Sequence, residues 1–135
     1  MQWIDRGLWE LSLHESWSVR DDPECLTITK SDAAAFQLSS ATKLDGPIEL
    51  QEIRDSRELP EGVSPTDIAL GDFRGFAANY VDEEGLWQKF WLVHGSLLVF
   101  ATYLGTEGSW AVDRREVLSM LNTIRVRATA NRLAS

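Results

Sequence analysis

The sequence contains little of several residue types that often identify a function. Its 135 residues include a single cysteine, Cys25, and only two histidines. A lone cysteine excludes an intrachain disulfide and is typical of a chain that works in a reducing compartment. The histidines, His14 and His94, have no cysteine or acidic residue near them at the spacing of metal ligands, so we expect no metal site.

Long apolar runs are also missing. None approaches the roughly 20 residues that a membrane-spanning helix needs, so we expect no membrane association. Residues 1–6 show no basic start followed by an apolar block, and we therefore expect no secretory signal. With the lone cysteine, this predicts a cytoplasmic protein.

The motifs of common catalytic sites are absent as well. We find no nucleophile elbow, no P-loop and no dinucleotide fingerprint. Gly71 and Gly75 lie between predicted strands rather than before a helix, so they provide no helix N-terminus for a phosphate. We therefore expect no cofactor, and a protein that is not an enzyme.

Acidic charge, in contrast, is plentiful and unevenly distributed. The net charge is −8, and residues 45–84 hold eleven acidic residues against three basic ones. Such a surface repels nucleic acid and anionic membranes, whereas it attracts a basic protein. Acidic surfaces also serve solubility alone, and this alternative remains open.

Residues 73–104 dominate the fold prediction. Three apolar, aromatic-rich runs, Phe73–Tyr80, Leu86–His94 and Leu97–Leu104, are separated by turns at Gly85 and Gly95. This pattern predicts an antiparallel meander. Since Leu86–His94 and Leu97–Leu104 are apolar on both faces, we expect central strands covered on both sides.

The rest of the chain completes an α+β domain spanning residues 1–135. We predict an antiparallel sheet of about six or seven strands, which ends in the aromatic meander and is flanked by two helices. The additional strands are expected at Trp9–His14, Trp17–Arg20, Cys25–Thr29, Ala33–Ser40 and Ile68–Leu70. The segment Ala33–Ser40 is ambiguous, because its three alanines favour a helix, and we choose a strand because the turn before it would close a hairpin with Cys25–Thr29. The helices are expected at Pro47 to about Leu59 and at Asp113–Ile124, with Asp113 as N-cap and Glu116 completing a capping box. Residues 126–135 are expected to fray.

A candidate partner-binding surface follows from the meander. It comprises the acidic turn and two aromatic residues that alternate on the next strand: Asp82, Glu83, Glu84, Trp87 and Trp91. Aromatic residues recur in interface hot spots. Core packing beneath a helix is the ordinary alternative for the tryptophans, and a solvated turn is the alternative for the acids.

Three segments carry a family resemblance: the turn Leu70–Phe76, the hairpin Gly85–Tyr103 and the closing run Leu118–Arg125. Because these three segments follow one another in this order, the chain resembles the PsbP-like superfamily from about Trp17 to Arg125. That group includes a photosystem II extrinsic subunit, a Ran-binding nuclear import factor and many small bacterial proteins. The resemblance implies an antiparallel sheet flanked by helices and action by protein binding, without catalysis. It assigns no functional residues.

These observations favour a non-enzymatic protein-binding domain that holds a basic partner through its acidic surface. Some bacterial relatives in the group resemble immunity proteins of toxin systems, so an immunity-like role is one form of this hypothesis. An acidic secretion chaperone is one alternative, and a small-molecule-binding protein or enzyme with a pocket between sheet and helix is another. The sequence leaves the oligomeric state open.

Overall fold

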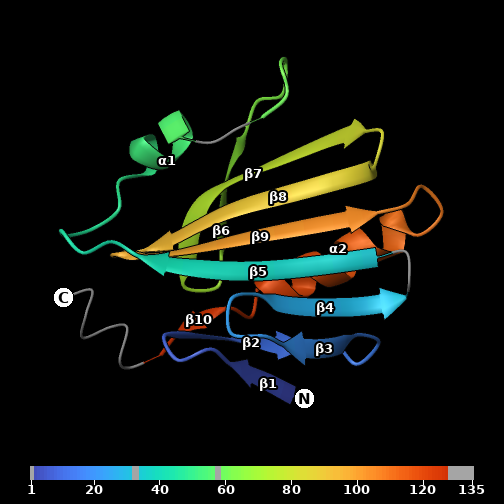
Figure 1. Ribbon diagram of the computed structural model, residues 1–135, viewed down its shortest axis with the longest axis horizontal. Coiled ribbons are helices and arrows are strands. Elements are labelled where there is room, and N and C mark those ends of the chain that lie inside the picture. Colours follow the sequence, from blue (N-terminus) through green and yellow to red (C-terminus); the bar gives the residue numbers. More distant parts are fainter. Residues whose placement is uncertain (1, 32–33, 57–58, 128–135) are drawn as a thin grey trace.

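Ten strands and two helices make up the computed structural model, which describes residues 2–31, 34–56 and 59–127 (Figure 1). The strands are β1 (Gln2–Asp5), β2 (Trp9–Leu13), β3 (Ser18–Asp21), β4 (Leu26–Ser31), β5 (Ala34–Thr42), β6 (Thr66–Leu70), β7 (Phe73–Asp82), β8 (Gly85–His94), β9 (Leu97–Gly105) and β10 (Arg125–Val126). The helices are α1 (Leu50–Ser56) and α2 (Trp110–Leu121).

The strands form two antiparallel sheets. Seven of them pair in the order β3-β4-β5-β9-β8-β7-β6, and the other three pair in the order β1-β2-β10. The predicted meander is confirmed, because β7, β8 and β9 are consecutive neighbours in the large sheet. The α+β class and the sheet of six or seven strands are therefore correct, although the small second sheet was not predicted.

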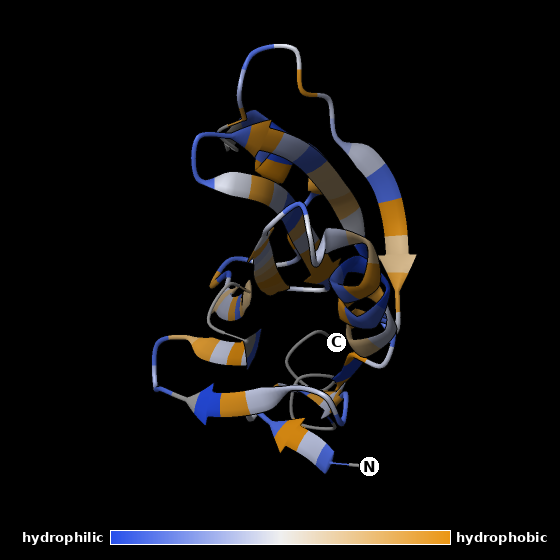
Figure 2. Cartoon of the chain, turned by 90° about the vertical axis from the view of Figure 1, so that its right-hand side faces the viewer, coloured by the Kyte–Doolittle hydropathy of each residue, from blue (hydrophilic) through white to orange (hydrophobic). Residues whose placement is uncertain are grey.

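The inner face of the large sheet is the one that α2 covers, and it carries the main core. Alternate residues of β9, from Leu97 to Tyr103, are fully or almost fully buried there. Val117, Met120 and Leu121 of α2 pack against the same cluster. Hydrophobic and hydrophilic bands follow one another along the strands (Figure 2), as a sheet with two different faces requires.

The outer face of the large sheet carries a second, smaller apolar cluster. Phe76 and Trp91 face each other across β7 and β8, with ring centroids 5.2 Å apart. Ile53 of α1 packs against this cluster, and the Arg54 guanidinium lies 5.4 Å from the centre of the Phe76 ring. The prediction of central strands covered on both sides therefore holds in the part of the sheet next to α1.

Two glycines make the turns of the meander. Gly85 and Gly95 have φ of +143° and +59°, a region that side chains with a Cβ rarely adopt. The carbonyl groups of Gly95 and Ser96 also accept backbone hydrogen bonds from Ile48 and Lys43. The β8–β9 turn is thereby tied to the segment that leads into α1.

Both helices occupy positions that differ from the predicted ones. Helix α1 begins at Leu50 rather than Pro47, because Ile48 is bonded to the β8–β9 turn and Glu52 bonds back to the Glu49 N–H at 2.8 Å. Helix α2 begins at Trp110, so the prediction of Asp113 as N-cap is wrong. Residues 57 and 58, within the predicted first helix, lie outside the described residues.

The predicted frayed tail is only partly within the described residues. Val126 belongs to β10, which pairs with β2, and its N–H donates to the Asp72 carboxylate at 2.9 Å. The start of the tail is therefore ordered, because it pairs with the edge of β2 and because the Asp72 carboxylate accepts a hydrogen bond from its backbone. Residues 128–135 lie outside the described residues.

Candidate functional site

The acidic turn predicted as a contact surface joins β7 to β8 at one end of the large sheet. Asp82, Glu83 and Glu84 are all exposed. The Asp82 carboxylate accepts hydrogen bonds from the Glu84 N–H at 2.9 Å and from the Trp87 indole N–H at 3.0 and 3.1 Å. This turn therefore has a fixed shape and presents its carboxylates next to an aromatic ring.

Trp87 lies on the outer face, half-buried, beyond the part of the sheet that α1 covers. Its ring is stacked on Tyr80 of the neighbouring strand, with centroids 6.4 Å apart. The Lys89 ammonium lies over both rings, 5.1 Å from Trp87 and 5.3 Å from Tyr80. Such cation–π contacts and the Asp82 hydrogen bonds hold the indole in place while part of it faces solvent.

Trp91 does not share this environment. It is 7% exposed and packs between Phe76 and Phe100 in the outer cluster, under Ile53 of α1. Of the two tryptophans predicted for the contact surface, only Trp87 is therefore accessible. Trp91 matches the ordinary alternative, core packing beneath a helix.

Part of the acidity between residues 45 and 84 is neutralised by ion pairs. Lys43 binds Glu52 at 2.9 Å, and Arg54 binds Asp67. The hydrogen bond from Lys43, followed by that from the Glu49 N–H, lowers the pKa of Glu52. The acidic turn differs, since among the described residues Glu83 and Glu84 form no ion pair.

A cavity of about 400 Å³ lies on the inner face, between the sheet and α2. We call it the Gln88 pocket. Its apolar walls come from Ile68, Ala77, Ala78, Phe90 and Leu118, and its polar walls from Ser64, Thr66, Asp67, Asn79, Gln88 and Arg114. Its position, between sheet and helix, is where the small-molecule alternative placed a binding site.

Next to this pocket lies a group of linked polar side chains under α2, which we call the Asp113 network: Lys30, Tyr103, Asp113 and Glu116, with His14 at its edge. The Asp113 carboxylate, 2% exposed, accepts from the Tyr103 hydroxyl at 2.8 Å and from Lys30 at 3.2 Å. Lys30 also bonds Glu116, and this bond is the main reason why the pKa of Lys30 is raised.

Tyr103 fits under α2 because the neighbouring backbone leaves room for its hydroxyl. A Cβ on Gly105 would lie 2.0 Å from that oxygen. Burial, followed by the hydrogen bond to Asp113, raises the pKa of Tyr103 well above its usual value of 10.0. Tyr103 is thus a buried, bonded core residue and is not available to a partner.

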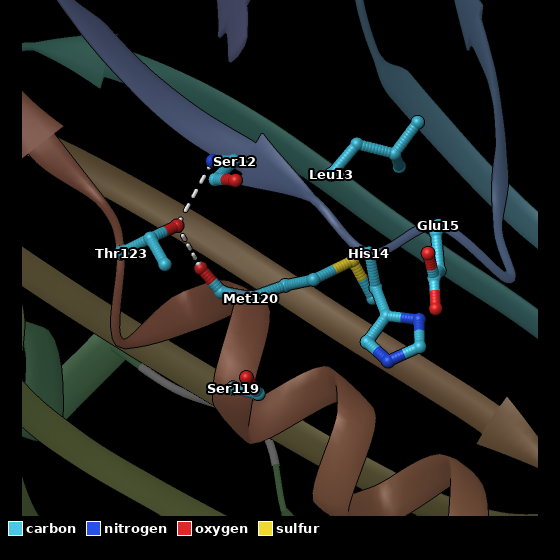
Figure 3. A pocket seen from close by; sticks show the side chains of 7 residues that line it. All are labelled: Ser12, Leu13, His14, Glu15, Ser119, Met120 and Thr123. Atoms are coloured by element: carbon cyan, nitrogen blue, oxygen red, sulfur yellow. Dashed lines mark hydrogen bonds between the residues drawn. The ribbon is translucent and has the colours of Figure 1, made fainter. Parts of the chain in front are cut away.

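A second cavity, of about 390 Å³, lies where β2 meets the C-terminal end of α2 (Figure 3). The Ser12 N–H donates to the Thr123 hydroxyl at 2.9 Å, which in turn donates to the Met120 carbonyl at 2.6 Å. His14 Nδ1 accepts from the Ser16 N–H at 3.1 Å, and Nε2 lies 3.2 Å from Glu116. Four of the lining residues, Ser12, His14, Met120 and Thr123, are thus bonded within the chain.

Neither a metal centre nor a membrane-spanning helix is present among the described residues. No group of three or more His, Cys, Asp or Glu side chains there is arranged to hold a metal ion. None of the helices in that part of the chain is long and apolar enough to cross a membrane.

Comparison with known proteins adds information about the fold alone. No protein-family model matches the chain, and no curated protein matches it either. Among solved structures, it is similar to a crystal structure from Bacteroides thetaiotaomicron VPI-5482, with a TM-score of 0.58 and 13% sequence identity. The similarity covers 90% of this chain but 46% of the other, so the chain spans about half the length of that protein.

The residues of the Gln88 pocket were not predicted as a site from the sequence. Its signal was Gln88 itself, a polar residue on the strand face that also carries Leu86, Phe90 and Leu92. The position of Arg114 at the pocket could not be predicted from the sequence, because it depends on the residue at which α2 begins. The acidic turn was found directly, since both its charge and its glycine are local features.

Proposed function

We propose that this chain is a non-enzymatic protein-binding domain that holds a basic protein through the surface formed by Asp82, Glu83, Glu84 and Trp87. The observation that carries this proposal is the pair of hydrogen bonds from the Trp87 indole to the Asp82 carboxylate, at 3.0 and 3.1 Å. These bonds fix an aromatic ring beside a group of carboxylates before any partner arrives. Less conformational entropy is then lost on binding.

The composition of this surface supports a basic partner. Interface centres are enriched in aromatic residues, and carboxylates around them attract lysine and arginine side chains. The net charge of −8 also favours encounter with a basic protein over one with nucleic acid.

An immunity-like role in the cytoplasm is the particular form that we favour. The resemblance to the PsbP-like superfamily, whose better-known members act by binding proteins, points in the same direction. A toxin-binding protein needs a pre-shaped, charged surface and no catalytic residues of its own. We therefore propose a basic toxin or effector as the partner class.

The test is capture of host proteins at low salt with quantitative mass spectrometry, using three forms of the chain. These are the native sequence, a variant with Asp82→Asn, Glu83→Gln and Glu84→Gln, and a control with the same loss of charge elsewhere, Asp45→Asn, Glu61→Gln and Glu107→Gln. A basic protein should be enriched by the native and control forms, lost with the first variant, and weakened by added salt. Equal capture by all three forms would contradict the proposal.

A further inference from the structure

The Gln88 pocket contains a polar group that the described protein leaves without a partner. Gln88 is 2% exposed, and its Oε1 accepts no hydrogen bond there. A buried acceptor without a donor is costly, and native proteins leave few of them. Oε1 itself is sealed from solvent, so a bound molecule that donates an N–H or O–H would remove this cost once the Gln88 amide turns toward the cavity that its side chain lines.

Charge in the pocket favours a negatively charged group on the same molecule. Two charged residues line it, Asp67 and Arg114. Asp67 is bound by Arg54 of α1 and belongs, by its pairing with Phe76, to the outer face of the sheet. Arg114 forms no ion pair within the described residues, and its guanidinium is held 4.9 Å from the centre of the Trp110 ring.

We propose that the Gln88 pocket binds a small monocarboxylate that also carries a hydroxyl or amide N–H. The carboxylate pairs with Arg114, and the hydroxyl or N–H donates to Gln88. Thr66 and Asn79, which line the same cavity, supply further hydrogen-bonding groups, and Phe90 and Leu118 contact the apolar part. This function is separate from the proposed protein binding, because Trp87 lies on the other face of the sheet.

Two observations limit the ligand to a single negative charge. The whole chain carries −8, so each additional negative charge on a ligand increases the repulsion. Among the described residues that line the pocket, Arg114 is also the only positively charged one. Nucleotides and other polyanions are therefore poor candidates, whereas hydroxy acids and N-acyl amino acids satisfy both Arg114 and Gln88.

The experiment is an NMR titration of the ¹⁵N-labelled chain with two probes, glycolate and N-acetylglycine. Both should shift the backbone amide signals of Thr66, Asn79 and Gln88. Propionate lacks the hydrogen-bond donor, and N-acetylglycine methyl ester lacks the negative charge. The affinity of each should be lower by a factor of about ten or more, as expected for one lost charge-assisted hydrogen bond.

Matched variants separate binding from folding. Arg114→Gln and Gln88→Met should each weaken N-acetylglycine about tenfold or more. The controls Arg115→Gln, one residue further along α2, and Gln37→Met, an exposed position on β5, should bind like the native chain. The variant with three substitutions at residues 82–84 should also bind normally, so this test can fail while the proposed function stands.

Three results would overturn the proposal: no shift of the pocket signals with either acid, equal binding of the methyl ester, or unchanged binding by both pocket variants. The first would show that the cavity does not bind acids of this class.

Discussion

Two polar sites lie side by side on the inner face of the sheet, and they differ in whether their groups are satisfied. Tyr103 and Gln88 are directly opposite each other on β9 and β8, and Asp113 and Arg114 are consecutive on α2. In the Asp113 network, the buried hydroxyl and carboxylate bond each other at 2.8 Å. In the Gln88 pocket, the buried acceptor has no donor and Arg114 forms no ion pair within the part of the chain that the structure describes.

The two sites are expected to contribute differently to the stability of the fold. A buried polar group that is satisfied within the chain stabilises the fold, and its removal leaves its partner unsatisfied. A buried polar group without a partner lowers stability, as at Gln88 and at the indole nitrogens of Trp9 and Trp17. Gln88 differs from the two tryptophans because it lines the cavity that Arg114 also lines. The two sites should therefore respond in opposite directions when a polar group is removed.

The largest expected effect is at Asp113. Asp113→Ala should lower the free energy of unfolding by about 2–3 kcal/mol, since the buried Tyr103 hydroxyl would lose its charged acceptor. Urea unfolding followed by tryptophan fluorescence measures this change. A double-mutant cycle with Tyr103→Phe should show strong coupling; additive effects would mean that the two groups do not act together.

The opposite sign is expected at Gln88. Gln88→Met keeps the size of the side chain and removes the unpartnered oxygen, so the free energy of unfolding should rise by about 1–2 kcal/mol. Gln37→Met, the same change at an exposed position, should change it by less than about 0.5 kcal/mol. If Gln88→Met destabilised the protein as Asp113→Ala does, the contrast between the two sites would be wrong.

The sequence revealed the strands better than it revealed this contrast. Alternation and glycine turns are local, and they predicted the meander and the strand at Ala33–Ser40, of which Ala33 lies outside the described residues. The start of α2 was misplaced, because Asp113 matches an N-cap by residue type while its true partners, Lys30 and Tyr103, are 83 and 10 residues away. Contacts between residues so far apart in the sequence depend on the tertiary structure, so local patterns do not predict them.

The predicted contact surface shows the same limit. Both Trp87 and Trp91 lie on the outer face of β8, and both were predicted to belong to the contact surface. Trp91 packs between Phe76 and Phe100 and is covered by Ile53 of α1, whereas Trp87 lies outside this cluster. A tertiary contact from another part of the chain therefore decided which tryptophan remains accessible.

Alkaline pH should weaken the Asp113 network selectively. The pKa of Tyr103 is raised above 10.0 and that of Lys30 above 10.5, so the folded state keeps protons that the unfolded chain loses. The stabilisation that these two groups contribute is fully present below their unfolded-state pKa values, and it is lost as the pH rises through their raised folded-state pKa values. Urea unfolding from neutral pH to above pH 10 should show this fall, and Tyr103→Phe should make it shallower. An unchanged slope in that variant would indicate that Tyr103 titrates normally.

The smallest expected effect on stability is at Arg114. This substitution gives the most direct comparison of the two sites, because Arg114 adjoins Asp113 in the same helix. Although Arg114 adjoins Asp113, it forms no ion pair within the described residues, so Arg114→Gln should change the free energy of unfolding by less than about 0.5 kcal/mol. Urea unfolding of this variant beside Asp113→Ala measures two consecutive residues of one helix with the same probe. A loss at Arg114 as large as that at Asp113 would show that the arginine is part of the fold rather than a group reserved for a ligand. A near-zero loss means that folding does not account for an arginine at the wall of a polar cavity.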